Sequence, residues 1–351
     1  MTTPLLELKH VTKVFGHGEG ATVALSDFSF AIGEDAATIV AVAGESGSGK
    51  STLARLMLGF ISPSAGEVRY RGTDLRRLSR AERRNFRREI QAIFQDPFGV
   101  YNPFYRVDHL LTTPIKNFKL ASSRAEARRQ IETALATVGL NPGEILGRYP
   151  HQLSGGQRQR ITIARALLLR PRLIIADEPV SMVDASLRAT ILESLLTLNR
   201  EFGISFIYIT HDLTTAYQIS EQLIILYRGV VAEAGPAKQV IRHPQHPYTQ
   251  LLIRSIPTPD PGQRWMEEVV ASSGEGTDAA VWQGCPFASR CPHVMPMCQE
   301  ERPPLYLTEG AAVSCYLYRE SPTIEEGDLT VTLGALAGAG SRGNGSITVG
   351  S

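Results

Sequence analysis

Runs of apolar residues alternate with amphipathic patterns through the first 255 residues. Residues 37–43 (ATIVAVA) form an unbroken apolar run, and other runs occupy 173–176, 205–210 and 222–227. A run without polar alternation is typical of a strand buried on both faces. Residues 186–202, between two of these runs, show the spacing of a helix. Strands that alternate with helices predict an α/β fold with a parallel sheet and crossover helices.

The remaining patterns predict a second sheet, further helices and a change of character after residue 255. The pattern over residues 5–72 predicts largely short strands with turns, and that over residues 122–139 predicts an amphipathic helix. Residues 69–89 hold nine arginines against three acidic residues, which favours the solvated face of a helix. Four linker residues then follow, namely Pro257, Pro259, Pro261 and Gly262. We therefore expect a main domain over 1–255, a small domain over 256–320 and a flexible tail over 321–351 rich in Gly, Ala and Ser.

Composition narrows the possible functions. The chain has 351 residues, of which 43% are hydrophobic and 20% charged, and its formal net charge is +1. This balance excludes a predominantly polybasic nucleic-acid binder and argues against general disorder. No apolar run approaches the roughly 18 residues of a membrane span, and the start lacks a secretory signal pattern. We expect a cytosolic protein that reaches a membrane through a partner.

A glycine-rich turn after the first buried run carries a phosphate-binding pattern. Residues 44–51 (GESGSGKS) fit GxxxxGK[ST], with a strand before them and a helical pattern after them. Glycines let backbone N–H groups surround phosphate oxygens, and the helix N-terminus faces the same anion. Lys50 is expected to reach the β- and γ-phosphates, and Ser51 to ligate Mg²⁺. The predicted nucleotide-binding residues are Gly44, Glu45, Ser46, Gly47, Ser48, Gly49, Lys50, Ser51 and Thr52.

Two acidic residues end a second buried run. Asp177 is placed to hold Mg²⁺ through water, and Glu178 to polarise the attacking water. Alone, such a pair is more typical of acidic residues in the first turn of a helix. Together with the glycine-rich turn, it predicts a nucleotide hydrolase.

The segment 153–157 (LSGGQ) resembles the signature of the ABC ATPase family and lies 20 residues before the acidic strand. The residues that carry it are Ser154, Gly155, Gly156 and Gln157, at the start of a predicted helix, where they would form an anion site. The alternative is a glycine-containing helix cap. The resemblance implies a P-loop fold with a RecA-like core, an antiparallel β subdomain and a helical subdomain at about 96–165. It also implies that this site binds the γ-phosphate held by a second ATPase subunit.

Further positions match the family in chain order. Gln95 resembles the glutamine that contacts Mg²⁺ and senses the γ-phosphate, and Asp184 the aspartate that crosses the dimer interface. His211 resembles the histidine that contacts the γ-phosphate and orients water. Phe15 resembles the aromatic residue on which adenine stacks, with a core aromatic as the alternative. The resemblance implies an active ATPase with Lys50, Gln95, Glu178 and His211 as catalytic residues.

Within the family, the chain resembles the ATPase subunits of oligopeptide/dipeptide importers. The segments FQDPFGVYNPF at 94–104, HPYTQLL at 246–252 and GCPFASRCP at 284–292 carry this resemblance. It implies a peripheral protein at the cytoplasmic face of the inner membrane. The implied partners are a second ATPase subunit, identical or paralogous, two permease subunits and an extracytoplasmic substrate-binding protein, with no nucleic acid. Relatives import oligosaccharides or nickel, so the substrate stays open, and the rival class is a non-transport ABC ATPase acting on a ribosome or DNA.

The loop after Gln95 predicts a contact with the permease. Phe98, Tyr101 and Phe104 are three aromatics in one short loop, and exposed apolar loop residues commonly mark a partner site. The alternative is that they cover the core of the helical subdomain.

All four cysteines lie within 31 residues, with the spacing Cys-x5-Cys-x6-Cys-x16-Cys. The short knuckles of structural zinc sites are absent, and all-cysteine ligation suits iron–sulfur clusters. The family resemblance also implies a [4Fe–4S] cluster. Zinc and free thiols remain alternatives to the cluster. A structural role for the bound group is simpler than a redox role. The predicted ligands are Cys285, Cys291, Cys298 and Cys315.

Overall fold

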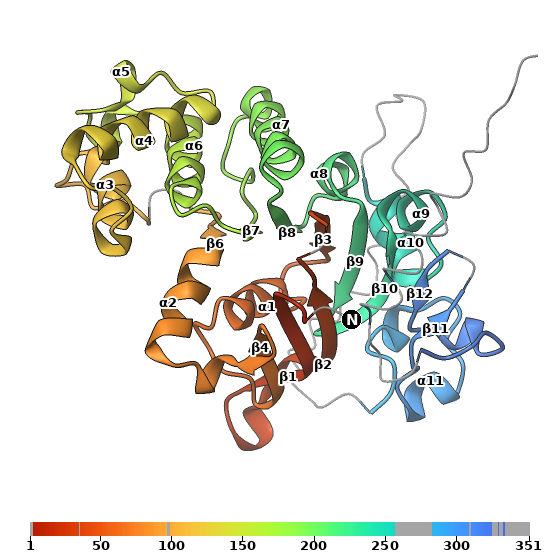
Figure 1. Ribbon diagram of the computed structural model, residues 1–351. Coiled ribbons are helices and arrows are strands. Elements are labelled where there is room, and N and C mark those ends of the chain that lie inside the picture. The colour runs from red at the N-terminus through yellow and green to blue at the C-terminus, as the bar shows by residue number, and fades with distance from the viewer. Residues whose placement is uncertain are drawn as a thin grey trace, which may run out of the picture.

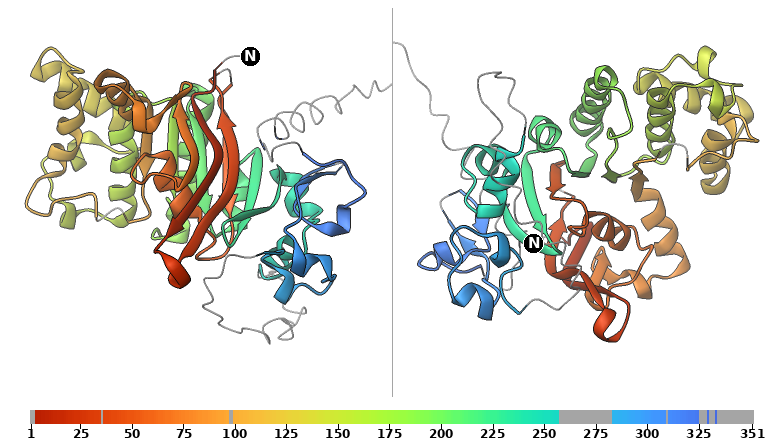
Figure 2. Two further views of the ribbon diagram at one scale, coloured as in Figure 1. Left: turned by 90° about the horizontal axis from the view of Figure 1, so that it is seen from below. Right: turned by 180° about the vertical axis from the view of Figure 1, so that it is seen from behind.

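Two sheets and a layer of helices make up the described part of the chain. The computed structural model describes residues 3–34, 36–96, 99–256, 283–308 and 310–324, together with Leu329 and Leu333. Figure 1 shows the helices of residues 107–167 and the C-terminal segment at opposite ends of the larger sheet. Figure 2 shows the same separation from two other directions.

The larger sheet has the order β11-β12-β10-β9-β3-β8-β7-β6. Its strands from β6 to β9 pair in parallel, whereas β10, β12 and β11 pair antiparallel. The central strands are buried on both faces because their side chains are almost all apolar, which confirms the expected parallel sheet. The strands are β3 (Ile39–Ala43), β6 (Ile90–Ile93), β7 (Leu173–Asp177), β8 (Ser205–Thr210), β9 (Gln222–Tyr227), β10 (Val230–Pro236), β11 (Tyr306–Leu307) and β12 (Ala312–Val313).

A smaller antiparallel sheet covers one face of the larger sheet. Its order is β2-β1-β4-β5, and the strands are β1 (Leu6–Phe15), β2 (Thr22–Ile32), β4 (Ala65–Tyr70) and β5 (Thr73–Asp74). A hydrophobic core joins this sheet to α1 (Lys50–Met57) and to the same face of β3 and β8. The glycine-rich turn between β3 and α1 therefore lies between two packed layers.

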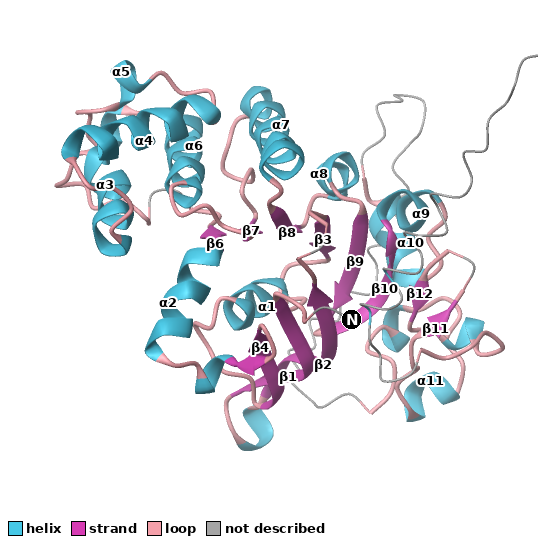
Figure 3. Cartoon of the chain, viewed as in Figure 1, coloured by secondary structure: helices cyan, strands magenta, loops and turns pink. Residues whose placement is uncertain are grey.

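Helices cover the opposite face, as Figure 3 shows in cyan around the magenta strands. A second core joins them to the other face of the larger sheet. These helices are α3 (Val107–Phe118), α4 (Arg124–Thr137), α5 (Pro142–Ile145), α6 (Gly155–Leu167), α7 (Ala185–Phe202), α8 (Leu213–Ile219), α9 (Ala237–Arg242) and α10 (Pro247–Arg254). Short 3-10 turns are η1 (Gly18–Gly20), η2 (Leu75–Arg77), η3 (Pro150–Gln152), η5 (Ala288–Arg290) and η6 (Tyr316–Tyr318).

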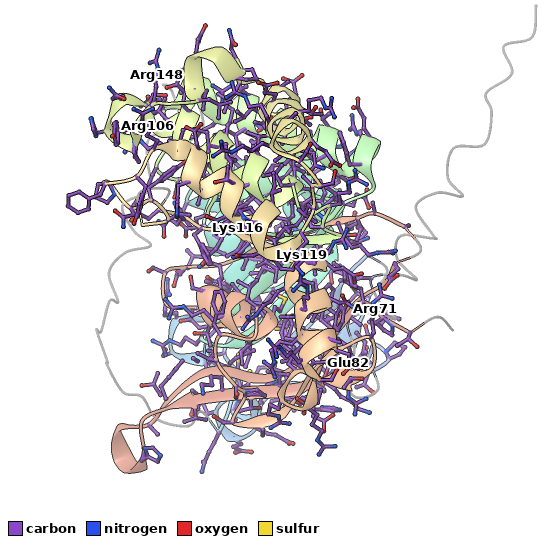
Figure 4. The ribbon with its side chains drawn as sticks, turned by 60° about the vertical axis from the view of Figure 1, so that its left-hand side comes forward. Arg71, Glu82, Arg106, Lys116, Lys119 and Arg148 are labelled. Carbon is purple, nitrogen blue, oxygen red and sulfur yellow. The ribbon has the colours of Figure 1, made fainter. Side chains whose placement is uncertain are left out.

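The arginine-rich stretch 69–89 is not one helix, which corrects the expectation. Residues at its start pair in β4 and β5, and α2 (Arg80–Glu89) begins after Ser79. Ser79 and Glu82 form a capping box that starts the helix there. Figure 4 shows Arg71 before this helix and Glu82 in its first turn.

The C-terminal segment joins the larger sheet. β12 pairs with β10, and β11 with β12, while α11 (Met297–Glu300) and the turns η5 and η6 surround the cysteines. The proline-rich linker and most of the tail lie outside the described residues. The boundaries at 255 and 320 stay predictions.

Among the helices of the described residues, none is both long enough and apolar enough to cross a membrane.

Candidate functional site

The glycine-rich turn links β3 to the N-terminus of α1. Gly44 has φ +153° and Gly49, the cap of α1, has φ +104°. A Cβ atom would lie 2.1 Å from the carbonyl oxygen of Leu226 at the first position and 2.3 Å from that of Ala24 at the second. The neighbouring backbone leaves no room for a side chain there, so the sequence needs glycine to form this turn.

Lys50 is folded over the turn. Its Nζ donates to the carbonyl oxygens of Gly44 at 2.8 Å and of Glu45 at 2.7 Å, and to Oγ of Ser48 at 3.3 Å. The side chain is buried, and this burial lowers the pKa of Lys50, while three nearby carboxylates raise it. The cation therefore lies where the turn would surround an anion. Ser46 and Gly47 at the tip of the turn are exposed, and Thr52 is half-buried in α1.

The structure brings Ser51 and Asp177 together. Oγ of Ser51 lies 3.5 Å from Oδ1 of Asp177, although the two residues are 126 positions apart. Asp177 ends β7, which pairs with β8, and β8 pairs with β3 in front of the turn. Burial raises the pKa of the Asp177 carboxyl. A hydroxyl and a carboxylate at one position are oxygen ligands of the kind that Mg²⁺ prefers.

Glu178 and His211 also meet, at the ends of neighbouring strands. Nδ1 of His211 lies 3.0 Å from Oε1 of Glu178. Glu178 has φ +48°, and its N–H donates to the carbonyl oxygen of Ile209 at 2.8 Å. The carboxylate is largely shielded, whereas the His211 side chain is 59% exposed.

Three further predicted residues are at least partly exposed at the ends of other elements. Gln95 is exposed and follows β6, whose last residue Ile93 pairs with Ala176 of β7. Asp184 is exposed at the cap of α7 and makes no side-chain cap bond. Phe15 ends β1 with 41% of its surface exposed, and Nζ of Lys13 lies 5.1 Å from its ring centroid. An exposed ring at this position suits stacking more than core packing.

The signature residues lie on a different element. Ser154 caps α6, accepting from the N–H of Gln157 at 3.2 Å, while Gln157 Oε1 accepts from the N–H of Ser154 at 3.0 Å. Gly156 is packed under α7, where a Cβ would lie 2.7 Å from Cδ1 of Leu187. Gly155 opens the helix. Figure 1 shows α6 among the helices α3 to α5, apart from α1 and its turn.

A contact between the C-terminal segment and the phosphate-binding turn was not expected from the sequence. Arg290 pairs with both carboxylate oxygens of Glu45, at 3.0 and 3.1 Å. The main-chain N–H of Glu45 donates to the hydroxyl of Tyr248 at 2.9 Å. Both partners sit in motifs that the sequence analysis singled out, the HPYT segment and the stretch between Cys285 and Cys291.

The four cysteines line one small pocket. Cys285, Cys291, Cys298 and Cys315 share it with His246 and Phe287. Burial raises the pKa of the first two thiols and that of Cys315 to about 11. In the part of the chain that the structure describes, no three His, Cys, Asp or Glu side chains are arranged to hold a metal ion. The structure thus gathers the predicted ligands without giving support for a cluster.

Comparison with known proteins agrees with this geometry. Residues 25–181 match the ABC transporter family, and residues 232–298 match the C-terminal region of oligopeptide/dipeptide transporters. A putative oligopeptide transport ATP-binding protein of Bacillus subtilis is 40% identical over 326 residues, covering 92% of this chain and 98% of that protein. A di/tripeptide transport ATP-binding protein of Pseudomonas aeruginosa is 36% identical, with coverage of 85% and 91%.

Solved structures show the same fold. The ATP-binding cassette MJ0796, solved as a dimer in a post-hydrolysis state with ADP and Pi, has a TM-score of 0.58 and 30% identity. That alignment covers 66% of this chain and 98% of the other. CbiO1 of Clostridium perfringens, at 24% identity and 69% and 92% coverage, has a TM-score of 0.59 and shares the fold. The chain therefore belongs to the ABC transporter family, as an ATPase subunit of the oligopeptide/dipeptide type.

Proposed function

We propose that this chain hydrolyses ATP at the turn between β3 and α1 to drive peptide uptake through a membrane permease. One observation carries the assignment of the site. Ser51 of α1, the pair Asp177 and Glu178 at the end of β7, and His211 directly after β8 converge beside the buried Lys50. This is the set of groups needed to hold a triphosphate, ligate a divalent cation and position a water molecule.

Each residue has a separate role in the proposed reaction. Lys50 and the turn's N–H groups bind the phosphates, and Phe15 supports the adenine. Glu178 accepts a proton from water as a bond forms to the γ-phosphorus and the bond to the β–γ bridging oxygen breaks, giving ADP and phosphate. His211 holds that carboxylate and the water in place. Bound Mg²⁺, held by Ser51, Gln95 and Asp177, would offset charge on the phosphate oxygens.

We propose that two such subunits complete each other's sites. Ser154, Gly155, Gly156 and Gln157 lie on α6, apart from the phosphate-binding turn, so one chain carries two separate half-sites. The N-terminus of a helix with 13 residues favours an anion brought by a second subunit. Asp184, exposed at the cap of α7, would lie at the same interface. The MJ0796 cassette, which is dimeric with ADP and Pi bound, supports this arrangement.

We further propose that a groove beside α3 receives a short helix of the permease. The groove has a volume of about 480 Å³, and its lining includes Gln91, Tyr101, Tyr105, Arg106, His109 and Phe118. Figure 4 shows Arg106 and Lys116 on this side of the molecule.

The predicted aromatic loop supports this proposal in part. Tyr101 packs inward, and its hydroxyl donates to the carbonyl oxygen of Arg158 at 2.9 Å, so it covers the protein's own core. Phe104 is 86% exposed and Tyr105 51% exposed, as expected of a partner site. Phe98 lies outside the described residues.

Crosslinking tests the groove and the transport function together. In membranes that contain the assembled complex, a cysteine at Phe104 should crosslink to a permease subunit. A cysteine at Phe202, which is 54% exposed on α7, is the matched control and should not. Co-purification of ribosomes or DNA in place of permease subunits would contradict the transport role and favour a non-transport ATPase. The proposed location is the inner membrane's cytoplasmic face.

We also propose that the cysteine pocket holds a [4Fe–4S] cluster, with zinc as the alternative. The support is the donor set: four thiols, two buried and two half-buried, line one pocket in a segment with little core of its own. The cluster would staple the segment together.

A further inference from the structure

Glu45 of the phosphate-binding turn is held by two side chains from the C-terminal third of the chain. Nη1 of Arg290 lies 3.0 Å from its Oε2, and Nη2 lies 3.1 Å from its Oε1. This is a bidentate pair, the geometry in which arginine and carboxylate interact most strongly. Tyr248 accepts the main-chain N–H of the same residue. The turn is thus fixed through both its backbone and its one acidic side chain.

Aromatic packing holds Arg290 in this position. Its guanidinium lies 5.6 Å from the ring centroid of Phe287 and 5.9 Å from that of Tyr227, and Nη1 donates to the Tyr227 hydroxyl at 3.4 Å. Phe287 is 2% exposed and contacts the rings of Tyr227, His246 and Tyr248. These contacts limit the freedom of Arg290, so little entropy is lost when it pairs.

The same arginine lies between two of the clustered cysteines. It ends the turn η5, in which the N–H of Ala288 donates to the carbonyl oxygen of Cys285 at 3.0 Å and that of Cys291 donates to Ala288 at 3.3 Å. Both cysteines line the shared pocket. Whatever orders these two cysteines therefore also orders the turn that presents Arg290.

Charge gives this contact a role in binding phosphate. The carboxylates of Glu45, Asp177 and Glu178 each attract the ammonium group of Lys50, the cation of the phosphate-binding turn, and so raise its pKa. An unpaired Glu45 carboxylate would compete with phosphate for that cation and would repel a triphosphate. Arg290 cancels this charge from the side where Phe287 and Tyr227 pack.

We propose that Arg290 is a positioning residue for nucleotide binding, which pairs with Glu45 and makes the affinity of the turn for MgATP depend on the order of the cysteine segment. This inference rests on the proposed function of the turn as the ATP site. It assigns the C-terminal segment a role in the ATPase reaction in addition to its own stability.

Equilibrium dialysis of the purified full-length chain with Mg²⁺ and a non-hydrolysable ATP analogue tests the pair. Arg290→Ala should raise the Kd roughly threefold to fivefold, the scale of a well-formed pair that is about one-third exposed. Adding Glu45→Gln to that variant should return the Kd to within about twofold of wild type, because the repulsive charge is gone. Arg319→Ala is the matched control and should leave the Kd unchanged, since Arg319 contacts the sulfur atoms of Met295 and Met297 in its own segment.

A double-mutant cycle that combines Cys291→Ser with Arg290→Ala tests the link between the cysteines and nucleotide binding. Cys291→Ser should weaken binding by a similar factor, and combining it with Arg290→Ala should add little, because both act through one turn. Circular dichroism should show all variants folded. Losses that multiply in the double variant would overturn the link.

The result for Lys50→Ala separates the two proposals. If the wild type binds the analogue no better than Lys50→Ala, the proposed function fails. If Lys50→Ala loses binding while Arg290→Ala binds as wild type does, or if Glu45→Gln gives no recovery, the proposed function stands and this inference is overturned.

Discussion

His211 and Glu178 form a direct contact between the ends of two parallel strands, with Nδ1 of the histidine 3.0 Å from Oε1 of the glutamate. The left-handed backbone at Glu178, with φ +48°, turns the chain directly after β7. Non-glycine residues rarely adopt this conformation, and such residues cluster at functional sites. The contact leaves most of His211 exposed, so its ring is available to a substrate.

His211→Ala should reduce ATP turnover by roughly tenfold to 100-fold while changing the Kd for ATP by less than about threefold. The physical reason is that Glu178 would keep its position at the strand end but lose the partner that orients it. Steady-state ATPase assays and equilibrium binding measure the two quantities. His243→Ala, an exposed histidine at the end of α9, is the control. Unchanged turnover in His211→Ala would remove His211 from the proposed site.

Ser154→Ala should abolish most ATP turnover without weakening ATP binding to one chain. Ser79→Ala provides a matched control, because Ser79 and Ser154 both form capping boxes. Each substitution should cost about 1 kcal/mol of stability through the lost cap. Loss of turnover confined to Ser154→Ala would separate anion binding from capping. Equal turnover in the two variants would contradict the composite site.

Glu233→Gln should make the stability of the protein less dependent on pH. Glu233 is buried, accepts the N–H groups of Gln245 and His246, and has its pKa raised from 4.5 to about 7 by burial. Between these values the folded protein holds a proton that the unfolded chain releases. The free energy of unfolding therefore falls as pH rises from 4.5 through about 7.

Urea unfolding at pH 5 and pH 8 measures this effect. The stability of Glu233→Gln relative to wild type should improve at pH 8 by up to about 3 kcal/mol. Burial lowers the pKa of His246 to about 4. Its contribution to the free energy of unfolding is therefore lost as pH falls, the opposite of the trend for Glu233. Since His246 is present in both proteins, the difference isolates Glu233. A difference that does not change with pH would contradict this account.

Anaerobically purified protein should be brown and contain iron close to four atoms per chain, if all four thiols ligate one cluster. Cys315→Ser should lower this iron content. After removal of the metal, Cys315 should react slowly with iodoacetamide at pH 8, because burial raises the pKa of its thiol to about 11. One zinc and no iron would overturn the cluster but keep the ligands.

Local patterns predicted the strands and the phosphate-binding turn, whereas Gln95 and His211 became candidate catalytic residues only through the resemblance to the ABC ATPase family. The strands β8 and β9 begin and end as expected, because unbroken β-branched and aromatic runs suit a strand buried on both faces. The turn was recognisable because only glycine fits at Gly44 and Gly49.

Contacts between distant segments left no pattern in the sequence from which they could be predicted. The pair of Arg290 and Glu45 joins residues 245 positions apart, and nothing in the spacing of either motif indicates the other. The same holds for Tyr101, because the loop pattern left open whether its ring faces a partner or the core; the side chain is half-buried and its hydroxyl donates to α6. The cysteine segment was expected to form a small domain of its own, but its strands β11 and β12 extend the larger sheet through β10.

The most direct test of the central claim is ATP hydrolysis by Glu178→Gln, measured beside ATP binding by the same preparation. Glutamine keeps the size of the side chain but accepts no proton from water. Turnover should fall by roughly 100-fold or more, the scale of losing a general base, while the Kd for ATP stays close to that of wild type. Near-normal turnover in Glu178→Gln would contradict the assignment of this site.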